Sequence, residues 1–442
     1  MPVSDIAPSL AVFLSAFSHC FTRPSFESFS VLMAGWLSCP AKRTVTGVIR
    51  AAGAVGTKHH TSFHRFFREA RWEPDDVSDV LREMVVARVP RRKPLFVALD
   101  DTLARHTGKR IESASMHRDA LLSTGAKPFF HFGHVWVVMT VILTVPRWNK
   151  TFALPIGMRL YRSEKLCKAR KLSFHKKPQL AAQMLASIAE AHPQRRICAI
   201  ADSDYANSAV MKTLPGNVDF VGRSRMDAAL YAAPMKRQKG AMGRPRIKGE
   251  RLPSPAARAQ AWKGWKTVTV QVYGRTVEVE IKSFQALWYK VAGGRLMSFV
   301  IVRGWPGHRR DDVFFCTDLS VSPEEIIRRY CLRWSIEVTF QEAKGRLGFQ
   351  DPQNRCERAV QRTAPMALWA YSITVLMYLT ERPPITALPA FPWYRKDAPA
   401  FSDMLAAVRR DLWRYRLLDP PHGHRRDQKS VEDLIDAVAY AA

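Results

Sequence analysis

Paired cysteines are missing from this sequence of 442 residues. Its seven cysteines stand at positions 20, 39, 167, 198, 316, 331 and 356, and no two of them form a Cys-x-x-Cys pair. An odd number of cysteines without such pairs argues against a disulfide framework and against a structural zinc site. We therefore expect the protein in a reducing compartment, most simply the cytoplasm.

Long hydrophobic runs are missing as well. The longest, from Val135 to Val145, is far shorter than the roughly 20 apolar residues that a membrane-spanning helix needs. The start of the chain has no basic segment followed by an apolar core and a small-residue cleavage site. We expect neither a membrane span nor secretion, and the apolar run predicts a buried strand.

Acidic residues are few beside the basic ones. The chain has 39 Asp and Glu against 68 Lys and Arg, which leaves a net charge of +29. Such an excess indicates a polyanionic partner, most simply nucleic acid, although a ribosomal or membrane-surface role fits charge alone. The hydrophobic fraction of 47% is ordinary for a globular protein and is enough for a sizeable core.

Helical patterns fill residues 1–90, which we interpret as a helical DNA-binding domain. Two short helical patterns within it flank a break from Gly53 to Gly56, an arrangement that resembles a helix-turn-helix. The second helix would then present basic residues, including Lys58 and Arg65, to the major groove. Plain helical packing is the alternative interpretation.

Strand patterns begin after residue 91 and predict an α/β core. Three strand-like runs (94–101, 134–145 and 151–162) precede alternating helical and strand patterns up to residue 225, which favours a mixed sheet covered by helices. A basic loop and a β-rich insertion are predicted for 226–320. The core resumes over 321–385 with a helix, and 386–442 reads as a Pro-rich connector and a basic tail.

Three acidic positions could meet in such a core. Asp100, or its neighbour Asp101, and Asp202 each end an apolar strand, and Glu337 lies in a helical pattern. A strand-end aspartate alone is commonly a turn former or a helix cap. Three carboxylates from separate elements can, however, hold two Mg²⁺ ions, or two Mn²⁺ ions, for a phosphoryl displacement.

Four polar residues share one stripe of the helix that is predicted around Glu337. With Tyr330 at zero, Arg333 falls at roughly 300°, Glu337 at roughly 340° and Lys344 at roughly 320° around a 3.6-residue helix. A carboxylate flanked by two cations and a phenol suits a metal ion beside a phosphate. A solvated helix face with an internal ion pair is the plain alternative.

Together these motifs resemble the DDE-class transposases of bacterial insertion sequences, over roughly residues 25–385. The group in question carries a Tyr-x2-Arg-x3-Glu-x6-Lys signature, which is complete here as Tyr330, Arg333, Glu337 and Lys344. The family's Asp-x-Thr motif is matched by Asp100-Asp101-Thr102, and its Ala-Asp-x-x-Tyr context by the stretch ADSDY. The resemblance implies a ribonuclease-H-like core interrupted by a β-rich insertion.

The resemblance also implies roles. Asp100, Asp202 and Glu337 would be the catalytic metal ligands, with Asp101 as a competing first ligand. Tyr330, Arg333 and Lys344 would hold phosphates at the ends of the element. The implied activity is cut-and-paste transposition in the bacterial cytoplasm, at the nucleoid, by a homodimer that assembles on DNA.

Further DNA contacts are expected outside this set. Arg244 and Arg246 lie in a basic loop and could enter a narrow A·T minor groove, although a merely solvated loop is the alternative. A flipped base could stack on a tryptophan of the insertion, for which the candidates are Trp262, Trp265, Trp288 and Trp305.

Two other functions stay open at this stage. One is a catalytically inactive, DNA-binding repressor derived from a transposase. The other is a recombinase that uses Tyr330 as a covalent nucleophile without a metal.

Overall fold

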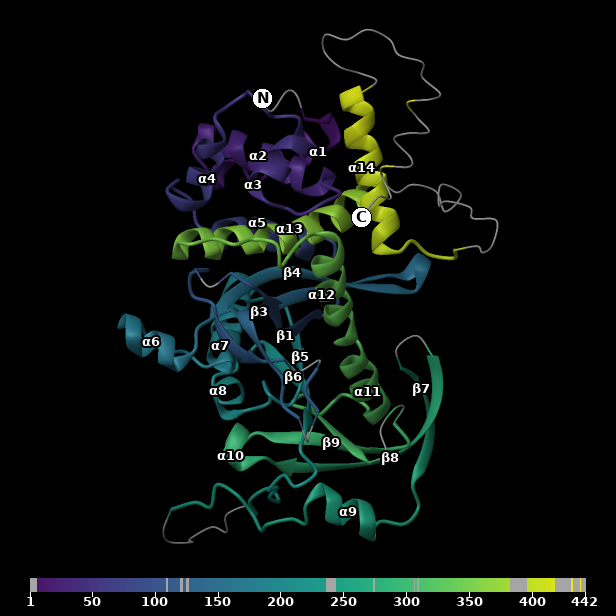
Figure 1. Ribbon diagram of the computed structural model, residues 1–442. Coiled ribbons are helices and arrows are strands. Elements are labelled where there is room, and N and C mark those ends of the chain that lie inside the picture. The colour runs from purple at the N-terminus through teal and green to yellow at the C-terminus, as the bar shows by residue number, and fades with distance from the viewer. Residues whose placement is uncertain are drawn as a thin grey trace.

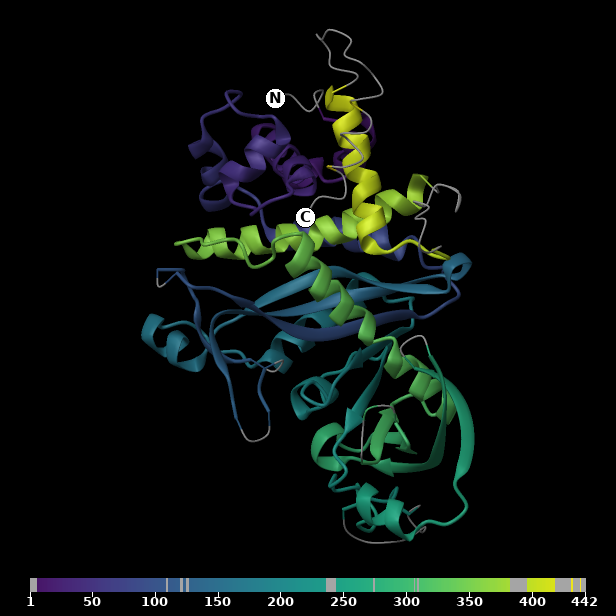
Figure 2. The same ribbon diagram turned by 45° about the vertical axis from the view of Figure 1, so that its right-hand side comes forward.

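The computed structural model describes residues 6–108, 110–119, 122–124, 127–235, 244–272, 275–305, 307, 310–381, 396–417, 431 and 438. Within these ranges a ten-stranded mixed sheet forms the middle of the molecule, and helices lie on both of its faces. The N-terminal helices sit at one end and the last four strands at the other (Figures 1 and 2). The fold is a mixed α/β fold, consistent with a ribonuclease-H-like architecture.

The N-terminal part is helical, as its periodicity predicts. Its elements are α1 (Pro8–Ser15), η2 (Ser18–Cys20), α2 (Arg23–Ser38), α3 (Val45–Ala52), α4 (His60–Arg68) and α5 (Pro74–Val86). Gly53 ends α3 with a φ of 72°, a left-handed conformation that glycine adopts without steric cost. The predicted break between the two short helices therefore exists, whereas binding of DNA by this unit remains a prediction.

The sheet begins with six strands in the order that positions the site. They are β1 (Leu95–Arg105), β2 (Ser115–Arg118), β3 (Phe130–Val145), β4 (Lys150–Tyr161), β5 (Ile197–Ala201) and β6 (Val218–Ser224). β3 runs antiparallel to β1, β2 and β4, β5 runs parallel to β1, and β6 runs parallel to β5. Between β4 and β6 the chain forms α6 (Glu164–Arg170), α7 (Lys177–Ala191) and α8 (Ser208–Met211).

The remaining strands extend this same sheet. They are β7 (Lys266–Val272), β8 (Arg275–Leu287), β9 (Leu296–Arg303) and β10 (Asp312–Cys316), and the helix α9 (Pro255–Ala261) precedes them. β10 pairs with β6, so these antiparallel strands continue the order β6-β10-β9-β8-β7. Within the predicted β-rich insertion, the stretch ALWYKVAG is not a separate strand: it ends β8 at Leu287 and turns through the short helix α10 (Tyr289–Ala292). The reason is the pairing of Leu287 with Leu296, which requires the chain to reverse between them.

The predicted helix around Glu337 is two helices. α11 (Pro323–Cys331) is preceded by Ser322, whose hydroxyl accepts a hydrogen bond from the Glu325 amide. α12 (Trp334–Arg346) follows after a two-residue junction. Across the junction the amides of Leu332, Arg333 and Ser335 bond to carbonyls three residues back instead of four, which interrupts the 3.6-residue period.

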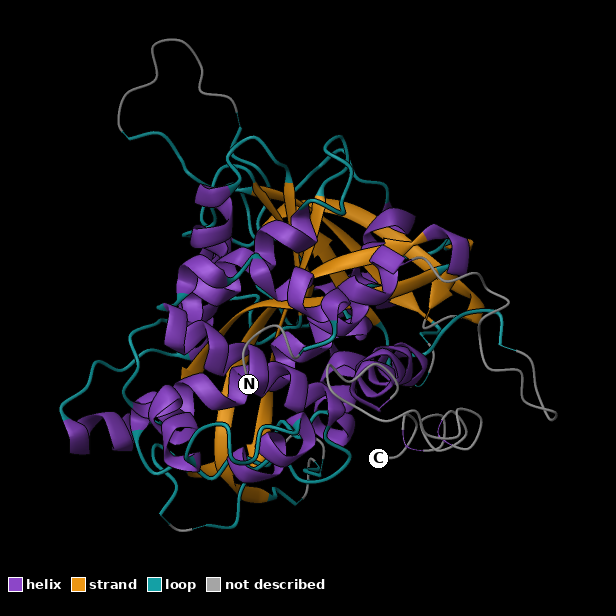
Figure 3. Ribbon diagram, turned by 90° about the horizontal axis from the view of Figure 1, so that it is seen from above, coloured by secondary structure: helices purple, strands orange, loops and turns teal. Residues whose placement is uncertain are grey.

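The last described helices attach the N-terminal unit to the core. α13 (Glu357–Glu381) packs along β4, and α14 (Phe401–Leu417) packs on α13 and α2. Buried arginines cap the C-terminal ends of N-terminal helices. Arg362 donates to the Ala70 carbonyl at 2.9 Å after α4, and Arg409 donates to the Leu37 carbonyl at 2.9 Å near the end of α2. Seen from above, helices overlie the strands (Figure 3).

The loop after α12 is bonded to the N-terminal helices as well. The Trp36 indole N–H donates to the Leu347 carbonyl at 2.8 Å, and the Arg43 amide donates to the Asp351 carboxylate at 2.8 Å. The Arg43 guanidinium also bonds to the Arg346 carbonyl. The end of α12 is therefore held by the first part of the chain.

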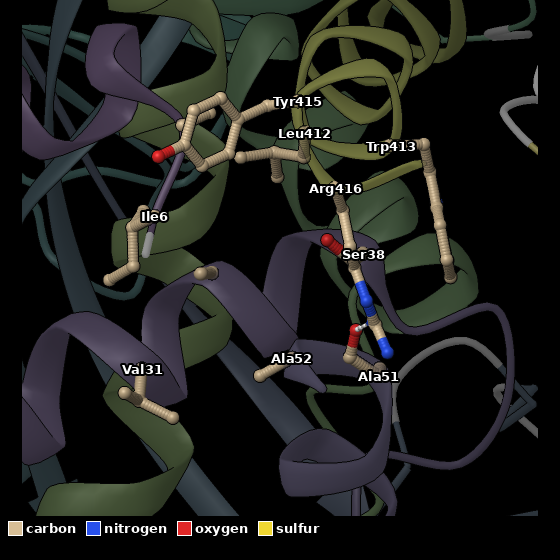
Figure 4. A pocket seen from close by; sticks show the side chains of 11 residues that line it. Ile6, Val31, Ser38, Ala51, Ala52, Leu412, Trp413, Tyr415 and Arg416 are labelled. Atoms are coloured by element: carbon tan, nitrogen blue, oxygen red, sulfur yellow. Dashed lines mark hydrogen bonds between the residues drawn. The ribbon is translucent and has the colours of Figure 1, made fainter. Parts of the chain in front are cut away.

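A cavity of about 30 Å³ lies between α2, α3 and α14. Figure 4 shows Arg416 of α14 reaching across it toward Ala51, whose carbonyl accepts a 2.7 Å hydrogen bond from the guanidinium. A space of this size holds about one water molecule. Asp100, Asp202 and Glu337 are not among the residues that line this cavity.

None of the helices in the described ranges is both long enough and apolar enough to cross a lipid bilayer.

Candidate active site

The pairing of β1 with β5 brings two of the predicted aspartates together. Leu99 of β1 is paired with Ala201, the last residue of β5, so Asp100 on β1 lies beside Asp202, which directly follows β5. The prediction that Asp100 ends its strand is wrong, because β1 continues to Arg105. Adjacent strands lie about 4.8 Å apart. The Asp202 carboxylate also accepts a 2.9 Å hydrogen bond from the Asp204 amide, which fixes the turn after β5.

Asp100 and Asp101 face opposite sides of the sheet, because side chains alternate along a strand. The Asp101 carboxylate accepts hydrogen bonds from Lys177 of α7 at 2.7 Å and from the Tyr205 hydroxyl at 2.9 Å. Asp100 lies on the other side, where α12 crosses β1. The alternative that the sequence left open therefore has a geometric answer: Asp100, and not Asp101, lies on the face that carries Glu337.

Arg333 joins Asp100 to Glu337. One guanidinium nitrogen, Nη1, lies 2.8 Å from Asp100 Oδ2, and the other, Nη2, lies 2.6 Å from Glu337 Oε1. The Arg333 side chain is 14% exposed, the Asp100 side chain 17% and the Glu337 side chain 35%. A cation thus stands between two of the three predicted metal ligands.

Burial and like charge shape the electrostatics here. Burial raises the pKa of Asp100 to about 7, the Asp202 and Asp101 charges act in the same direction, and Arg333 opposes them. The pKa of Asp202 is also raised, first by burial and then by Asp204. Burial alone would lower the pKa of Arg333, but Tyr330 and the Asp100 and Glu337 carboxylates raise it. A positive charge bound at this site would therefore stabilise the ionised carboxylates.

The four-residue stripe is spread along two helices. The Tyr330 ring is buried on α11 and packs on Phe314 with 4.5 Å between ring centroids, while the Arg333 guanidinium lies 5.8 Å from its centroid. Burial raises the pKa of Tyr330 to about 12. Lys344 lies two turns beyond Glu337, where burial and then Arg105 lower its pKa to about 8. Arg333 and Glu337 touch, and Tyr330 and Lys344 lie on either side of them along the helix axis.

The carboxylates of Asp100, Asp202 and Glu337 suit a hard divalent cation, provided that the Arg333 guanidinium moves away from them. In the described part of the chain no three Asp, Glu, His or Cys side chains converge on one point as they stand. The Arg333 guanidinium lies between Asp100 and Glu337 and accounts for their separation. Buried carboxylates that lack enough compensating charge are the ligands that Mg²⁺ or Mn²⁺ takes. The residues fit such an ion once Arg333 has another partner.

The other predicted DNA contacts lie away from these carboxylates. Lys58, which lies just before α4, pairs with Glu27 at 3.0 Å, and Arg65 on α4 pairs with Glu69 at 3.0 Å. Arg244 and Arg246 are exposed in the segment before α9, at the opposite end of the molecule (Figures 1 and 2). Residues 236–243 of the same basic loop lie outside the described residues.

The tryptophans that were candidates for base stacking are engaged in packing. Trp305 is buried, Trp288 meets the edge of the Phe315 ring at 5.7 Å, and Trp262 meets that of Phe284 at 5.6 Å. The Arg303 guanidinium covers Trp265 at 4.1 Å. A further tryptophan, Trp334, is 44% exposed and directly follows Arg333, and it was not among the predicted site residues. Its position at about 40° on the helical wheel, just beside the polar stripe, was the available signal.

Comparisons with known proteins agree with this architecture. A family model described as DDE superfamily endonuclease matches residues 16–283, which is more than half of the chain. The matched range contains Asp100 and Asp202 and ends before Glu337. A search of curated proteins finds no match to the chain.

Proposed function

Because the chain belongs to the DDE superfamily endonucleases, a family whose members are nucleases, we propose that it is the transposase of an insertion sequence. It would hydrolyse phosphodiesters at the ends of the element and then join the freed 3′-hydroxyls to target DNA. The Tyr-x2-Arg-x3-Glu-x6-Lys signature supports this finer assignment. The net charge of +29 supports DNA as the partner.

One observation carries the proposal: Glu337, far away in the sequence, is tied to Asp100 through Arg333 beside the neighbouring strand end of Asp202. Asp100 and Glu337 thus bond to the same guanidinium and Asp202 follows the neighbouring strand, although in the described part of the chain no three such side chains converge on one point. A merely solvated helix face would not place Arg333, with a side chain only 14% exposed, between two carboxylates.

The proposed ligands of a divalent metal pair, Mg²⁺ or Mn²⁺, are Asp100, Asp202 and Glu337. When bound, the ions would supply an activated water or 3′-hydroxyl and would stabilise the leaving oxygen. The protein's own groups position the DNA. Arg333 has two donors in a rigid fork that can leave the carboxylates for a phosphate, and Lys344 offers a second cation farther along α12.

The exposed Trp334 extends this substrate surface. Trp334 directly follows Arg333 in the sequence and is 44% exposed, and we assign to it a base that neighbours the phosphate held by Arg333. Base–aromatic stacking contributes roughly 1–3 kcal/mol. Because two DNA ends must be held for strand transfer, the proposal includes a homodimer that assembles on DNA.

The two alternatives differ in what they require of the site. A catalytically inactive repressor would bind end DNA and leave it uncut in Mg²⁺. A tyrosine recombinase would need an accessible nucleophile, whereas the Tyr330 side chain is buried against Phe314 and its pKa is raised to about 12. A protein–DNA adduct that survives denaturation would favour the recombinase.

The test is cleavage of DNA that carries the borders of the element by Glu337→Gln. This variant removes one negative charge at nearly constant shape, so we expect loss of at least about a hundredfold in Mg²⁺-dependent cleavage, with binding of the same DNA retained. Glu342→Gln is the matched control, because Glu342 lies on the same helix but pairs with Arg346 at 2.8 Å. Cleavage by Glu337→Gln at the wild-type rate would remove the catalytic assignment.

A further inference from the structure

A two-stranded ribbon, β2 with the first residues of β3, exposes apolar side chains that the fold does not use. Met116 is 59% exposed and Phe130 is 55% exposed. The ribbon departs from the sheet at Gly133, where an added Cβ would lie 2.0 Å from the Ala104 carbonyl oxygen, so only glycine allows this approach of the strands. Figure 2 shows the ribbon projecting away from the sheet.

The pairing register places these side chains on one face. Met116 lies opposite Phe132 and Arg118 lies opposite Phe130, and directly paired residues of antiparallel strands point to the same side. The alternate residues, His117 and His131, point to the other side, where His117 is buried near Tyr161. We call the exposed side, made of Met116, Arg118, Phe130 and Phe132, the ribbon face.

The charge of the ribbon suits a polyanion and opposes a second copy of the chain. Its two acidic residues are already compensated, because Glu112 pairs with Arg170 at 2.6 Å and Asp119 pairs with Arg105 at 2.6 Å. Arg118 is exposed and has no acidic partner among the described residues. Two ribbon faces brought together would therefore place like charges side by side.

The base of the ribbon adjoins the candidate site. Arg105 and Asp119, which hold the ribbon to β1, are the charged neighbours of Lys344 on α12. Asp119 is also fixed to the second strand by its amide, which donates to the Phe129 carbonyl at 2.8 Å. A DNA strand that passes Glu337 and Lys344 would then reach the base of the ribbon.

We propose that the ribbon face is a DNA-binding surface whose apolar side chains contact a distorted base step while Arg118 holds a neighbouring phosphate. Apolar side chains that enter between base pairs commonly kink duplex DNA, and a basic residue beside them offsets the phosphate charge. The inference rests on the proposed function only for its choice of DNA as partner. It requires no cleavage.

The experiment measures the affinity of the full-length protein for a short fluorescent duplex over a range of salt concentrations, without Mg²⁺. The double variant Met116→Ser, Phe130→Ser should bind about tenfold more weakly at every salt concentration, with the salt slope unchanged, because stacking is not electrostatic. Arg118→Ala should instead reduce the slope by about 1. Val12→Ser, which removes a 72% exposed side chain from α1, is the control.

A photo-crosslinking phenylalanine analogue at position 130 gives a readout that does not depend on the stability of the double variant. We expect crosslinks to DNA. Wild-type affinity of the double variant, crosslinks only to a second protein chain, or no DNA binding by the wild-type protein would each overturn the inference. DNA that is bound through the ribbon face but not cut in Mg²⁺ would instead contradict the proposed function and leave this inference standing.

Discussion

At the scale of single residues, the adjacent residues Asp100 and Asp101 have different surroundings because they point to opposite sides of β1. Asp100 and Asp101 have the same chemistry and adjacent numbers, yet one faces Arg333 and the other faces Lys177. The sequence favoured Asp100 by its spacing to Thr102 and could not exclude Asp101. Because side chains alternate along a strand, the face of the sheet that α12 covers determines which of the two aspartates lies near Glu337.

Substitutions at these two positions should therefore have different consequences. We expect Asp100→Asn to reduce Mg²⁺-dependent cleavage by at least about a hundredfold, because Asp100 is a proposed metal ligand. Its urea unfolding midpoint should stay at the wild-type value. Asp101→Asn leaves Lys177 without its anionic partner, so we expect destabilisation by about 1 kcal/mol and a smaller loss of cleavage. Cleavage assays together with urea unfolding of both variants check this prediction. Equal loss of cleavage in both would contradict the assignment.

Arg333 occupies the space that a metal ion would need, which gives a second prediction. In Arg333→Met the carboxylates of Asp100 and Glu337 lose their shared cation, and we expect binding of Tb³⁺ in the absence of DNA to tighten by about tenfold. Terbium luminescence measures this directly, without catalysis. Lys344→Met is the control, because Lys344 lies about 10 Å along the helix from Glu337. Unchanged or weaker Tb³⁺ binding by Arg333→Met would show that the guanidinium does not compete with the ion.

At the scale of elements, the turn after β5 depends on a contact across the sheet. Tyr205 follows Asp202 by three residues, is buried, and donates its hydroxyl hydrogen bond to Asp101 at 2.9 Å. The second aspartate is thereby attached to the strand that carries the first. This explains a Tyr at that spacing in physical terms: the phenol reaches under β1 from the turn.

Tyr205→Phe tests this attachment with little change in volume. We expect cleavage to fall by roughly tenfold and to recover at higher Mg²⁺ concentration, because a loss of about 1 kcal/mol in positioning weakens metal binding and leaves every ligand in place. The measurement is the Mg²⁺ dependence of the cleavage rate. A fall that excess Mg²⁺ does not restore would assign Tyr205 a different role.

The elements themselves were predictable to different degrees. Long periodic segments such as α2 and α13, and the apolar run of β3, follow from hydrophobic spacing. The junction at Leu332 and Arg333 does not, because both residues have helical dihedral angles and only the hydrogen-bond pattern changes. β10 lies within the predicted β-rich insertion, but its five residues are too few to show a period, and its pairing with β6 joins residues about ninety positions apart.

The sequence named residues of the candidate site but could not give their contacts. Spacing placed Arg333 and Glu337 on one stripe, but the bridge to Asp100 depends on how α12 crosses β1, which is a tertiary property. The same limit explains Trp334. A tryptophan in an apolar helix is usually a core residue, and only the packed structure shows this one exposed.

At the scale of the whole molecule, two histidines near the end of β1, the half-buried His106 and the buried His134, link stability to pH. Burial, and then His134, lower the pKa of His106 to about 4. Burial also lowers the pKa of His134. The His106 and His134 rings are joined by a 2.9 Å hydrogen bond. Between the ordinary value of about 6.5 and the folded value, the unfolded chain binds protons that the folded chain does not. This contribution therefore destabilises the fold as the pH decreases through that window.

His106→Asn removes one of these groups. We expect the wild type to lose about 1–2 kcal/mol more than the variant in free energy of unfolding between pH 7 and pH 5. Urea unfolding of both proteins at the two pH values measures the difference, in which the opposite contribution of buried carboxylates such as Asp100 cancels. An equal loss in both proteins would mean that His106 is protonated in the fold.

The bonds from Trp36 and Arg43 to the segment after α12 have a geometric consequence. They attach the N-terminal helices to the end of the helix that carries Glu337. A duplex held by those helices would reach the carboxylates at a set distance, so the cut would fall a constant number of base pairs from the bound sequence. The distance between these helices and the carboxylates, and not the base sequence at the break, would then determine the position of cleavage.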